Sequence, residues 1–277
     1  GAAHRDGQPV SAGRAPDVTA RSVTAGMIAS MNEPQPIVLS WSGGKDCLLM
    51  LRRLQADPRY RIVGLLTTVW TGERCVAMHR IPVSLLCGQV QSLGFDPVLM
   101  EVPPFPPNAV YESAFRRAMD RFRSQGVTSI AFGDLFLSDI RSYREDLCAR
   151  LGITPVFPLW GCSTTDLADE FLAAGYRARI CCTDARLGRE SVGTAYNAEF
   201  VSRLPAGIDP CGENGEFHTF VTDGPEFRTP VSLRMVEITA ADGFCWAQWA
   251  ESEPQTKLND TDGPRSRRVV FLGEESA

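Results

Sequence analysis

The sequence predicts an α/β protein in which a mostly parallel sheet carries helices on both faces and a smaller α+β region follows it. First, apolar β-branched runs alternate with segments of helical periodicity from Ile37 to Asp184, the pattern of a parallel sheet. Second, a glycine pair follows the first run and opens the first helical segment, where such sheets bind ligands. Third, the strand candidates beyond Asp184 follow one another without helices, which favours antiparallel pairing.

Six apolar runs are expected to form strands of the first region, at residues 37–41, 61–69, 97–102, 127–132, 153–158 and 178–183. Helical periodicity lies between them at roughly 45–56, 82–93, 110–124, 140–151 and 165–174. Thr164 and Thr165 offer a cap for the last of these helices. In the second region we expect a helix near 195–203 and strands at 217–222, 231–238 and 243–249.

This pattern divides the chain into four parts. Residues 1–35 are rich in Gly, Ala, Ser and Arg without an apolar core, so we expect a disordered extension there. Residues 36–184 would form the domain with the parallel sheet, and residues 185–250 the smaller region. The segment 251–277 is polar apart from the apolar residues 269–272, and we interpret it as a tail.

Composition excludes several classes of function. The net charge is −5 and the isoelectric point about 5.4, so no general basic field would attract nucleic acid, which we do not expect as a partner. The arginines at 116, 117, 121 and 123 form a local basic cluster whose spacing fits a solvated helix face. No apolar stretch approaches the roughly 18 residues of a membrane span, which argues against a membrane partner.

The cysteines indicate a reduced, cytoplasmic setting. Nine are spread along the chain, an odd number, and most lie inside apolar runs as buried free thiols do. None is paired as C-x-x-C, so zinc and iron–sulfur sites lack their usual ligand spacing, and three histidines are few for a dedicated transition-metal site. Nothing in the sequence indicates an oligomeric state, and a homodimer is kept as a hypothesis.

The turn Ser42-Gly43-Gly44-Lys45-Asp46 is the first candidate site. Two glycines let backbone N–H groups approach an oxyanion closely, and the start of the helix adds the favourable end of its dipole. Lys45, one of two lysines in the chain, could supply positive charge, while Asp46 could position Mg²⁺ or water. The alternative is a turn that only joins a strand to a helix. The turn matches neither the Walker A nor the G-x-G-x-x-G pattern.

A second polar segment begins where the fourth expected strand ends. Gly133 and Asp134 follow that strand, at the edge where a parallel sheet binds ligands. Arg141 and Arg144 lie three residues apart, so one helical face could present both to a phosphate or a carboxylate. The alternative is a solvated first helical turn with local ion pairs. The other polar residues of this segment are Ser138, Asp139, Tyr143 and Glu145.

The densest polar motif is Gly-Glu-Asn-Gly-Glu-Phe-His-Thr at residues 212–219. Glu213 and Glu216 lie three apart around a glycine and could bind an organic cation beside the Phe217 ring, or hold Mg²⁺. Asn214 lies between them. The alternative is a glycine-rich turn with solvated glutamates, and His218 fits a structural role as well as a catalytic one.

The glycine turn resembles the pyrophosphatase loop, S-G-G-K-D-[S/T/C], of the ATP-pyrophosphatase (PP-loop) branch of the HUP superfamily. Together with Met-His-Arg at 78–80 and the segments 131–161 and 207–220, it looks like the diphthine–ammonia ligase family. The resemblance runs from about Ile37 to Phe227. It implies a Rossmann-like fold over residues 36–184 and an acceptor-binding region over 185–250. The chain departs from the family pattern at Cys47, where serine is usual, at Met-His-Arg, where Met-His-Gly is usual, and at His218.

The resemblance also implies roles for individual residues. ATP would bind on the glycine turn, near the end of the second strand and beside the fourth, at Ser42, Gly43, Gly44, Lys45, Asp46, Cys47, Leu66, Thr67, Thr68, Gly133 and Asp134. The acceptor would contact Ser138, Asp139, Arg141, Arg144, Glu213, Asn214, Glu216 and His218. The residues expected to act in catalysis are Lys45, Asp46, Arg144, Glu213 and Glu216. Asp46 is the candidate Mg²⁺ ligand.

The implied reaction is a ligation in two steps, with ATP, ammonia and an acceptor carboxylate as substrates and Mg²⁺ as cofactor. The carboxylate would be adenylated with release of pyrophosphate, and ammonia would then form the amide and release AMP. The acceptor would be diphthine, a modified histidine of translation elongation factor 2, or a small carboxylic acid. The alternatives are sulfur insertion by the same adenylation, and a non-catalytic ATP-binding module.

Overall fold

The computed structural model describes residues 33–252 and 269–272. The expected extension over 1–35 lies almost wholly outside these residues. Of the expected tail over 251–277, residues 253–268 and 273–277 lie outside them, but Val270–Leu272 forms a strand of the parallel sheet, so the tail interpretation is wrong there. Within the described part of the chain, no helix is both long and apolar enough to cross a membrane.

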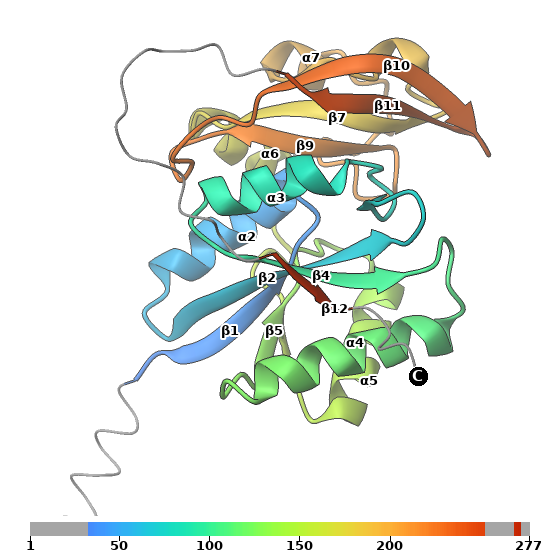
Figure 1. Ribbon diagram of the computed structural model, residues 1–277. Coiled ribbons are helices and arrows are strands. Elements are labelled where there is room, and N and C mark those ends of the chain that lie inside the picture. The colour runs from blue at the N-terminus through green and yellow to red at the C-terminus, as the bar shows by residue number, and fades with distance from the viewer. Residues whose placement is uncertain (1–32, 253–268, 273–277) are drawn as a thin grey trace, which may run out of the picture. The chain divides into compact units, whose positions relative to one another are not determined.

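A mostly parallel sheet forms the centre of the fold (Figure 1). Its strands run in the order β12-β4-β2-β1-β5-β6, each parallel to its neighbour, and β3 pairs antiparallel with β2. The strands are β1 (Gln35–Ser40), β2 (Tyr60–Trp70), β3 (Cys75–Val76), β4 (Pro97–Val102), β5 (Ser129–Ala131), β6 (Thr154–Val156) and β12 (Val270–Leu272). The predicted parallel sheet is therefore confirmed.

Helices cover both faces of this sheet, as predicted. Helices α4 (Asn108–Arg123) and α5 (Ser138–Leu151) lie on one face, and α2 (Lys45–Ala56) and α3 (Val83–Ser92) on the other (Figure 1). Alternate residues of β2 enter two different cores: Leu66 packs with α4, whereas Leu65 packs with α2 and α3. Both faces of β2 are thus apolar, which explains why its sequence is a nearly continuous apolar run.

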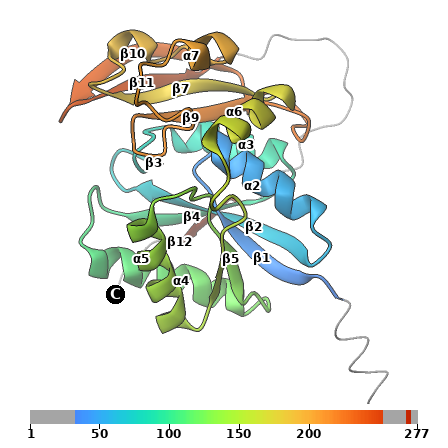
Figure 2. The ribbon, with the colours of Figure 1, turned by 180° about the vertical axis from the view of Figure 1, so that it is seen from behind.

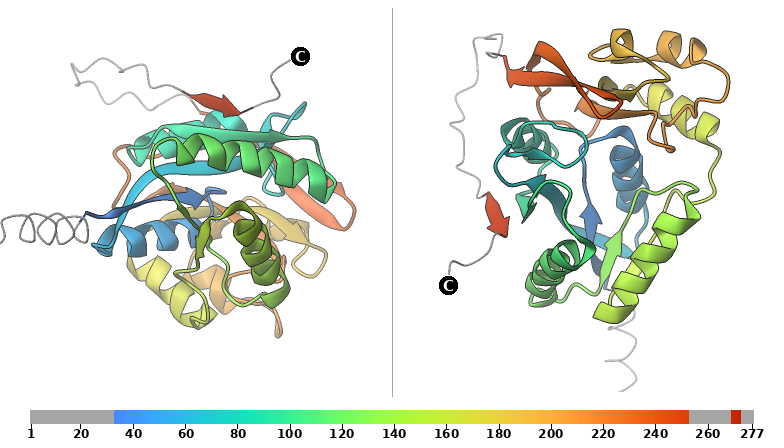
Figure 3. Two further views of the ribbon diagram at one scale, coloured as in Figure 1. Left: turned by 90° about the horizontal axis from the view of Figure 1, so that it is seen from below. Right: turned by 90° about the vertical axis from the view of Figure 1, so that its right-hand side faces the viewer.

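A five-stranded antiparallel sheet packs on the side of α2 and α3, as Figure 3 shows from two directions. Strand β7 lies in its middle, with β9 along one edge and with β11 and β8 along the other. The strands are β7 (Arg177–Asp184), β8 (Ala195–Tyr196), β9 (Phe217–Asp223), β10 (Leu233–Ala241) and β11 (Phe244–Glu251). Antiparallel pairing beyond Asp184 is confirmed. The remaining elements are α6 (Thr164–Ala173), η1 (Arg189–Ser191) and α7 (Ala198–Ser202).

The apolar run 178–183 was expected as the last strand of the parallel sheet, and this expectation is wrong. The run belongs to β7, the central strand of the antiparallel sheet. Burial on both faces makes a central strand read as a continuous apolar run in either kind of sheet, so the pattern alone does not identify the partner strands. The domain boundaries at 36, 184 and 250 stay a prediction.

The two sheets meet at the glycine turn. The Val221 backbone N–H of β9 donates to the Gly43 carbonyl at 2.9 Å, and the Lys45 N–H donates to Thr219 Oγ1 at 3.1 Å. Helices α2, α3 and α6 occupy the layer between the sheets (Figure 2). The described residues from Gln35 onward belong to one compact unit. The β1–α2 connection is therefore held from both sides.

Candidate active site

The glycine turn has a shape that its neighbours impose. Strand β1 ends at Ser40, Gly44 precedes the first residue of α2, and Gly43 has a left-handed φ of +83°. A Cβ on Gly43 would lie 2.8 Å from Gln89 Oε1. The fully buried Gln89 accepts a hydrogen bond from Trp41 Nε1 at 3.0 Å and donates to the Gly43 carbonyl at 2.9 Å. Helix α3 thus determines the conformation of the turn.

Lys45 points into the protein between the two sheets. Its side chain is almost fully buried, and Nζ donates to Asp46 Oδ2 at 3.0 Å and to the Cys211 carbonyl. The rings of Phe217 and Tyr196 lie 5.5 Å and 5.8 Å from Nζ. Burial lowers the pKa of Lys45, but the attractions of Asp46, Cys211 and Tyr196 together outweigh burial and leave that pKa above its ordinary value. Lys45 is therefore charged, and it ties the turn to the 209–217 segment.

Three carboxylates come together from distant parts of the chain. The Arg144 guanidinium pairs with Asp134 at 2.6 Å, and the Leu135 N–H donates to Glu213 Oε1 at 2.7 Å. Burial raises the pKa of Glu213 to about 7, and the charges of Asp46 and Asp134 add to this rise. Burial also raises the pKa of Asp46, against the opposing effect of Lys45. Asp46 Oδ1 is buried without a hydrogen-bond partner among the described residues.

These side chains line one cavity of about 320 Å³ at the carboxyl ends of β1, β2 and β5. The cavity is the place where a parallel sheet presents its ligand site. It brings together many of the residues singled out from the sequence: Ser42, Gly44, Lys45, Asp46, Cys47, Thr68, Gly133, Asp134, Arg144, Glu213 and His218. Their roles in binding and catalysis stay predictions.

Other predicted site residues lie outside the cavity: Gly43, Leu66, Thr67, Ser138, Asp139, Arg141, Asn214 and Glu216. Leu66 belongs to the core beneath α4, and Ser138 is exposed at the start of α5. Arg141 donates to Glu145 at 2.7 Å, on the side of α5 that faces the Trp160 ring. Glu216 is fully buried and accepts from the Asp209 N–H at 3.1 Å, so Glu216 braces the loop that presents Glu213.

Cys47 packs at the start of α2. Its Sγ accepts from the Ser42 N–H at 3.3 Å and lies 3.4 Å from Ser42 Oγ. Burial raises the pKa of Cys47, so the side chain remains a thiol at neutral pH. Its contacts are those of a residue that braces the turn.

Sequence reasoning missed some residues of the cavity wall and left the role of His79 open. Tyr111 reaches the cavity from the first turn of α4, and Thr219 reaches it from β9. The ring of His79 lies 4.6 Å from that of His218, centroid to centroid. Tyr111 follows strand β4, whose carboxyl end faces the same edge of the sheet, and that topological rule could have identified it. No spacing in the sequence connects Thr219 with the turn.

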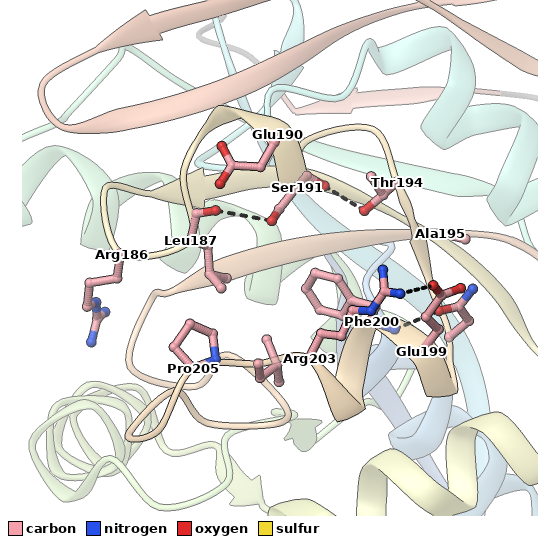
Figure 4. A pocket seen from close by; sticks show the side chains of 12 residues that line it. Arg186, Leu187, Glu190, Ser191, Thr194, Ala195, Glu199, Phe200, Arg203 and Pro205 are labelled. Atoms are coloured by element: carbon pink, nitrogen blue, oxygen red, sulfur yellow. Dashed lines mark hydrogen bonds and ion pairs between the residues drawn. The ribbon is translucent and has the colours of Figure 1, made fainter.

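A second cavity, of about 500 Å³, lies between the β7–β8 connection and α7 (Figure 4). Two pairs of its lining residues interact with each other: Arg203 pairs with Glu199 at 2.9 Å, and Ser191 Oγ donates to the Leu187 carbonyl at 3.1 Å. The ring of Phe200 separates this cavity from Phe217 in the wall of the first one. Asp46 Oδ1, the His79–His218 pair and Ser42, Gly44 and Lys45 of the glycine turn all belong to the first cavity.

Comparisons with known proteins show which proteins this chain resembles. Residues 163–250 match the family model described as the diphthamide synthase C-terminal domain. The chain is similar to the diphthine–ammonia ligase of Homo sapiens, with 30% identity over 160 residues, which are 52% of this chain and 59% of that protein. The ligase of Bos taurus is 30% identical over 43% of this chain and 47% of its own length, and that of Mus musculus 32% identical over 39% and 44%.

The chain thus spans about half the length of the curated relatives it matches. The family model covers the antiparallel sheet, and the glycine turn lies outside that match, in the parallel half. Over about half of its length the chain is therefore similar to diphthine–ammonia ligases, and its residues 163–250 match the diphthamide synthase C-terminal domain.

Proposed function

We propose that this protein is an ATP-dependent ligase that adenylates an acceptor carboxylate and converts the acyl-adenylate into an amide with ammonia. The observation that carries this proposal is the single cavity shared by the glycine turn, three carboxylates and Arg144. The relatives are named diphthine–ammonia ligases, so we propose a diphthine-like acceptor: a modified protein histidine or a small carboxylic acid. We propose a cytoplasmic setting as well.

The glycine turn would hold the phosphates of ATP. Helix α2 starts at this turn with Gly44 as its N-cap, which has no side chain to cap the helix; Thr219 Oγ1 accepts from the Lys45 N–H, and the positive end of the helix dipole is suited to an anion. Asp46, with its unpartnered Oδ1, suits Mg²⁺, which would neutralise phosphate charge when bound. No cluster of three or more metal-ligating side chains occurs among the described residues, which fits an ion that is held largely by substrate phosphates and water.

The proposed reaction requires the protein to position its substrates and to stabilise the charge that develops on the phosphates. In the first step an acceptor carboxylate oxygen bonds to the α-phosphorus, and the bond from that phosphorus to the pyrophosphate oxygen breaks. In the second step the nitrogen of ammonia bonds to the acyl carbon, and AMP leaves with the electron pair of the C–O bond. Glu213, whose pKa is about 7, is suited to take the proton that leaves the nitrogen. Arg144, at the cavity wall, is suited to balance charge on the phosphates.

The two thiols in the cavity are poorly suited to a sulfur-transfer reaction. Two thiols line the cavity, those of Cys47 and Cys211. Burial raises the pKa of both, and that of Cys211 rises to about 12. A thiol that stays protonated is a poor carrier of sulfur in a transfer reaction. The sulfurtransferase alternative therefore receives no support from these two residues.

The proposed function is tested by measuring the products of the reaction. The purified protein is incubated with ATP, Mg²⁺, ammonium chloride and a protein carrying diphthine, and in parallel with a panel of small carboxylic acids. We expect AMP and pyrophosphate in equal amounts, and an acceptor whose mass changes from acid to amide. ATP–pyrophosphate exchange without ammonium would isolate the first step. If ATP binds but no acceptor yields AMP, the protein is a passive ATP-binding module and the proposal fails.

A further inference from the structure

Two consecutive carbonyl groups of the 209–217 segment are each held by a buried side chain from another element. Tyr196, in β8, donates from its hydroxyl to the Pro210 carbonyl at 2.9 Å. Lys45, the first residue of α2, donates from Nζ to the Cys211 carbonyl. Lys45 and Tyr196 are both only 2% exposed. The segment is therefore held at one place by both halves of the fold, one donor coming from each.

The Lys45 ammonium has its partners inside the protein. Besides the Cys211 carbonyl it donates to Asp46 Oδ2 at 3.0 Å, and the ring centroids of Phe217 and Tyr196 lie 5.5 Å and 5.8 Å from Nζ. To reach a phosphate on the glycine turn, Nζ would have to give up two hydrogen bonds and its contacts with two rings, at a buried position where such contacts are strong. The contacts of Lys45 thus favour the 209–217 segment over the phosphates.

The held carbonyls lie next to the residue that the reaction needs. Asp209 Oδ2 accepts from the Cys211 N–H at 3.1 Å and from the Glu213 N–H at 2.9 Å. Glu213 Oε1 in turn accepts from the Leu135 N–H at 2.7 Å. Cys211 is therefore joined to Lys45 through its carbonyl and to Glu213 through the Asp209 carboxylate. A shift of the backbone at Cys211 would move the Glu213 carboxyl in the cavity.

From these contacts we propose that Lys45 and Tyr196 are positioning residues for Glu213, and that the Lys45 ammonium stays with the 209–217 segment while ATP is bound. They hold the segment in the conformation that places the Glu213 carboxyl at the acyl-adenylate. The end of α2 and Arg144 are left to balance phosphate charge. This inference rests on the proposed function, in which Glu213 takes the proton from the nitrogen, and it adds the residues on which that second step depends.

Tyr196→Phe tests the proposal with the loss of one atom. It removes the hydroxyl that holds the Pro210 carbonyl and keeps the ring, which packs on the Phe171 ring at 5.6 Å. We expect amide formation at saturating substrates to slow about five- to tenfold, the effect of one lost hydrogen bond, and ATP–pyrophosphate exchange to stay within about threefold of wild type. Tyr176→Phe is the matched control, because the Tyr176 ring also packs on Phe171 while its hydroxyl interacts with Glu226. Both rates should stay within about twofold in this control.

Lys45→Met separates the two possible roles of the lysine. Methionine keeps an unbranched side chain but makes neither the hydrogen bond to Cys211 nor the one to Asp46. We expect amide formation to slow about tenfold or more, and the Kd of a non-hydrolysable ATP analogue with Mg²⁺ to stay within about threefold of wild type. A Kd raised tenfold or more in Lys45→Met, with Tyr196→Phe unchanged, is the result expected of a phosphate ligand and would overturn the proposal.

The readout is the split between the two steps, because ATP–pyrophosphate exchange needs no ammonia. Equal losses in both rates would indicate a general loss of structure and would overturn the assignment. Unchanged amide formation in Tyr196→Phe would overturn it too. If Lys45→Met does not fold, Tyr196→Phe decides by the same two rates.

A second measurement needs no turnover and keeps this inference separate from the proposed function. Hydrogen–deuterium exchange of the backbone amides is followed by mass spectrometry in wild type and in Tyr196→Phe. We expect peptides that contain Leu135 or the 209–217 segment to exchange about fivefold faster or more in the variant, and those of α2 to be unchanged. Equal rates in both proteins would overturn the positioning role. If wild type forms no AMP with any acceptor, the proposed function fails, and this measurement alone decides whether Tyr196 holds the segment.

Discussion

Replacement of Gln89 by leucine is a direct test of how the glycine turn is held. The Gln89 amide is fully buried and makes three hydrogen bonds, with Trp41 Nε1 at 3.0 Å, with the Gly43 carbonyl at 2.9 Å and with the Val221 carbonyl at 2.7 Å. Leucine fills much of the same volume but can make none of them. Gly43 would keep its hydrogen bond from the Val221 N–H, whereas the Trp41 and Val221 groups would each lose a partner.

A buried polar group left unsatisfied costs roughly 1–3 kcal/mol, so two such groups predict a loss of about 2–6 kcal/mol in the free energy of unfolding. Urea denaturation followed by tryptophan fluorescence would measure the loss. KM for ATP should also rise, because the turn loses its support from α3. Ser84→Ala, at an exposed position of the same helix, is the matched control and should change stability by less than about 0.5 kcal/mol. A loss below about 1 kcal/mol with an unchanged KM for ATP would refute the reasoning.

Three further predictions concern the cavity and the glycine turn beside it. Asp46→Asn should lower ATP turnover by about a hundredfold or more while far-UV circular dichroism stays unchanged, and turnover within tenfold of wild type would contradict the role of Asp46. The pKa of Glu213, about 7 in the folded protein against an ordinary 4.5, means that the folded state keeps a proton that the unfolded state releases. The stability of the wild type therefore falls as pH rises between these two values. In urea titrations, Glu213→Gln should be more stable than wild type by about 1–2 kcal/mol at pH 8 but not at pH 4. If both proteins showed the same dependence of stability on pH, the Glu213 carboxyl would be excluded as its source. Gly43→Ala should lose more stability than Gly72→Ala, because both glycines have φ near +80° but a Cβ at Gly72 meets nothing within 4 Å. The strain of a left-handed backbone alone costs about 1–2 kcal/mol in either variant. Equal losses of stability in the two variants would show that the Gln89 side chain moves aside for the new methyl group.

The pattern of apolar runs and helical segments was sufficient to predict most elements of the parallel half. Helix α2 begins at Lys45 and ends at Ala56, as the periodicity predicts, because apolar residues repeat on one face and Asp57-Pro58 follows. Strand β7 shows the limit of such reasoning. Its apolar run is the same in a parallel and an antiparallel sheet, and its partners β8, β9 and β11 all come later in the chain.

The sequence by itself determined the glycine turn, the order of its flanking elements and the polar segments that join it in one cavity. Only the tertiary structure decided which residue of each segment faces that cavity. Glu213 and Glu216 are equivalent in the motif, yet Glu213 lines the cavity and Glu216 is buried behind it, because the loop turns between them. Lys45 faces the Cys211 carbonyl for a similar reason: the 209–217 segment folds back onto α2, and a contact across 166 residues leaves no periodic trace in the sequence.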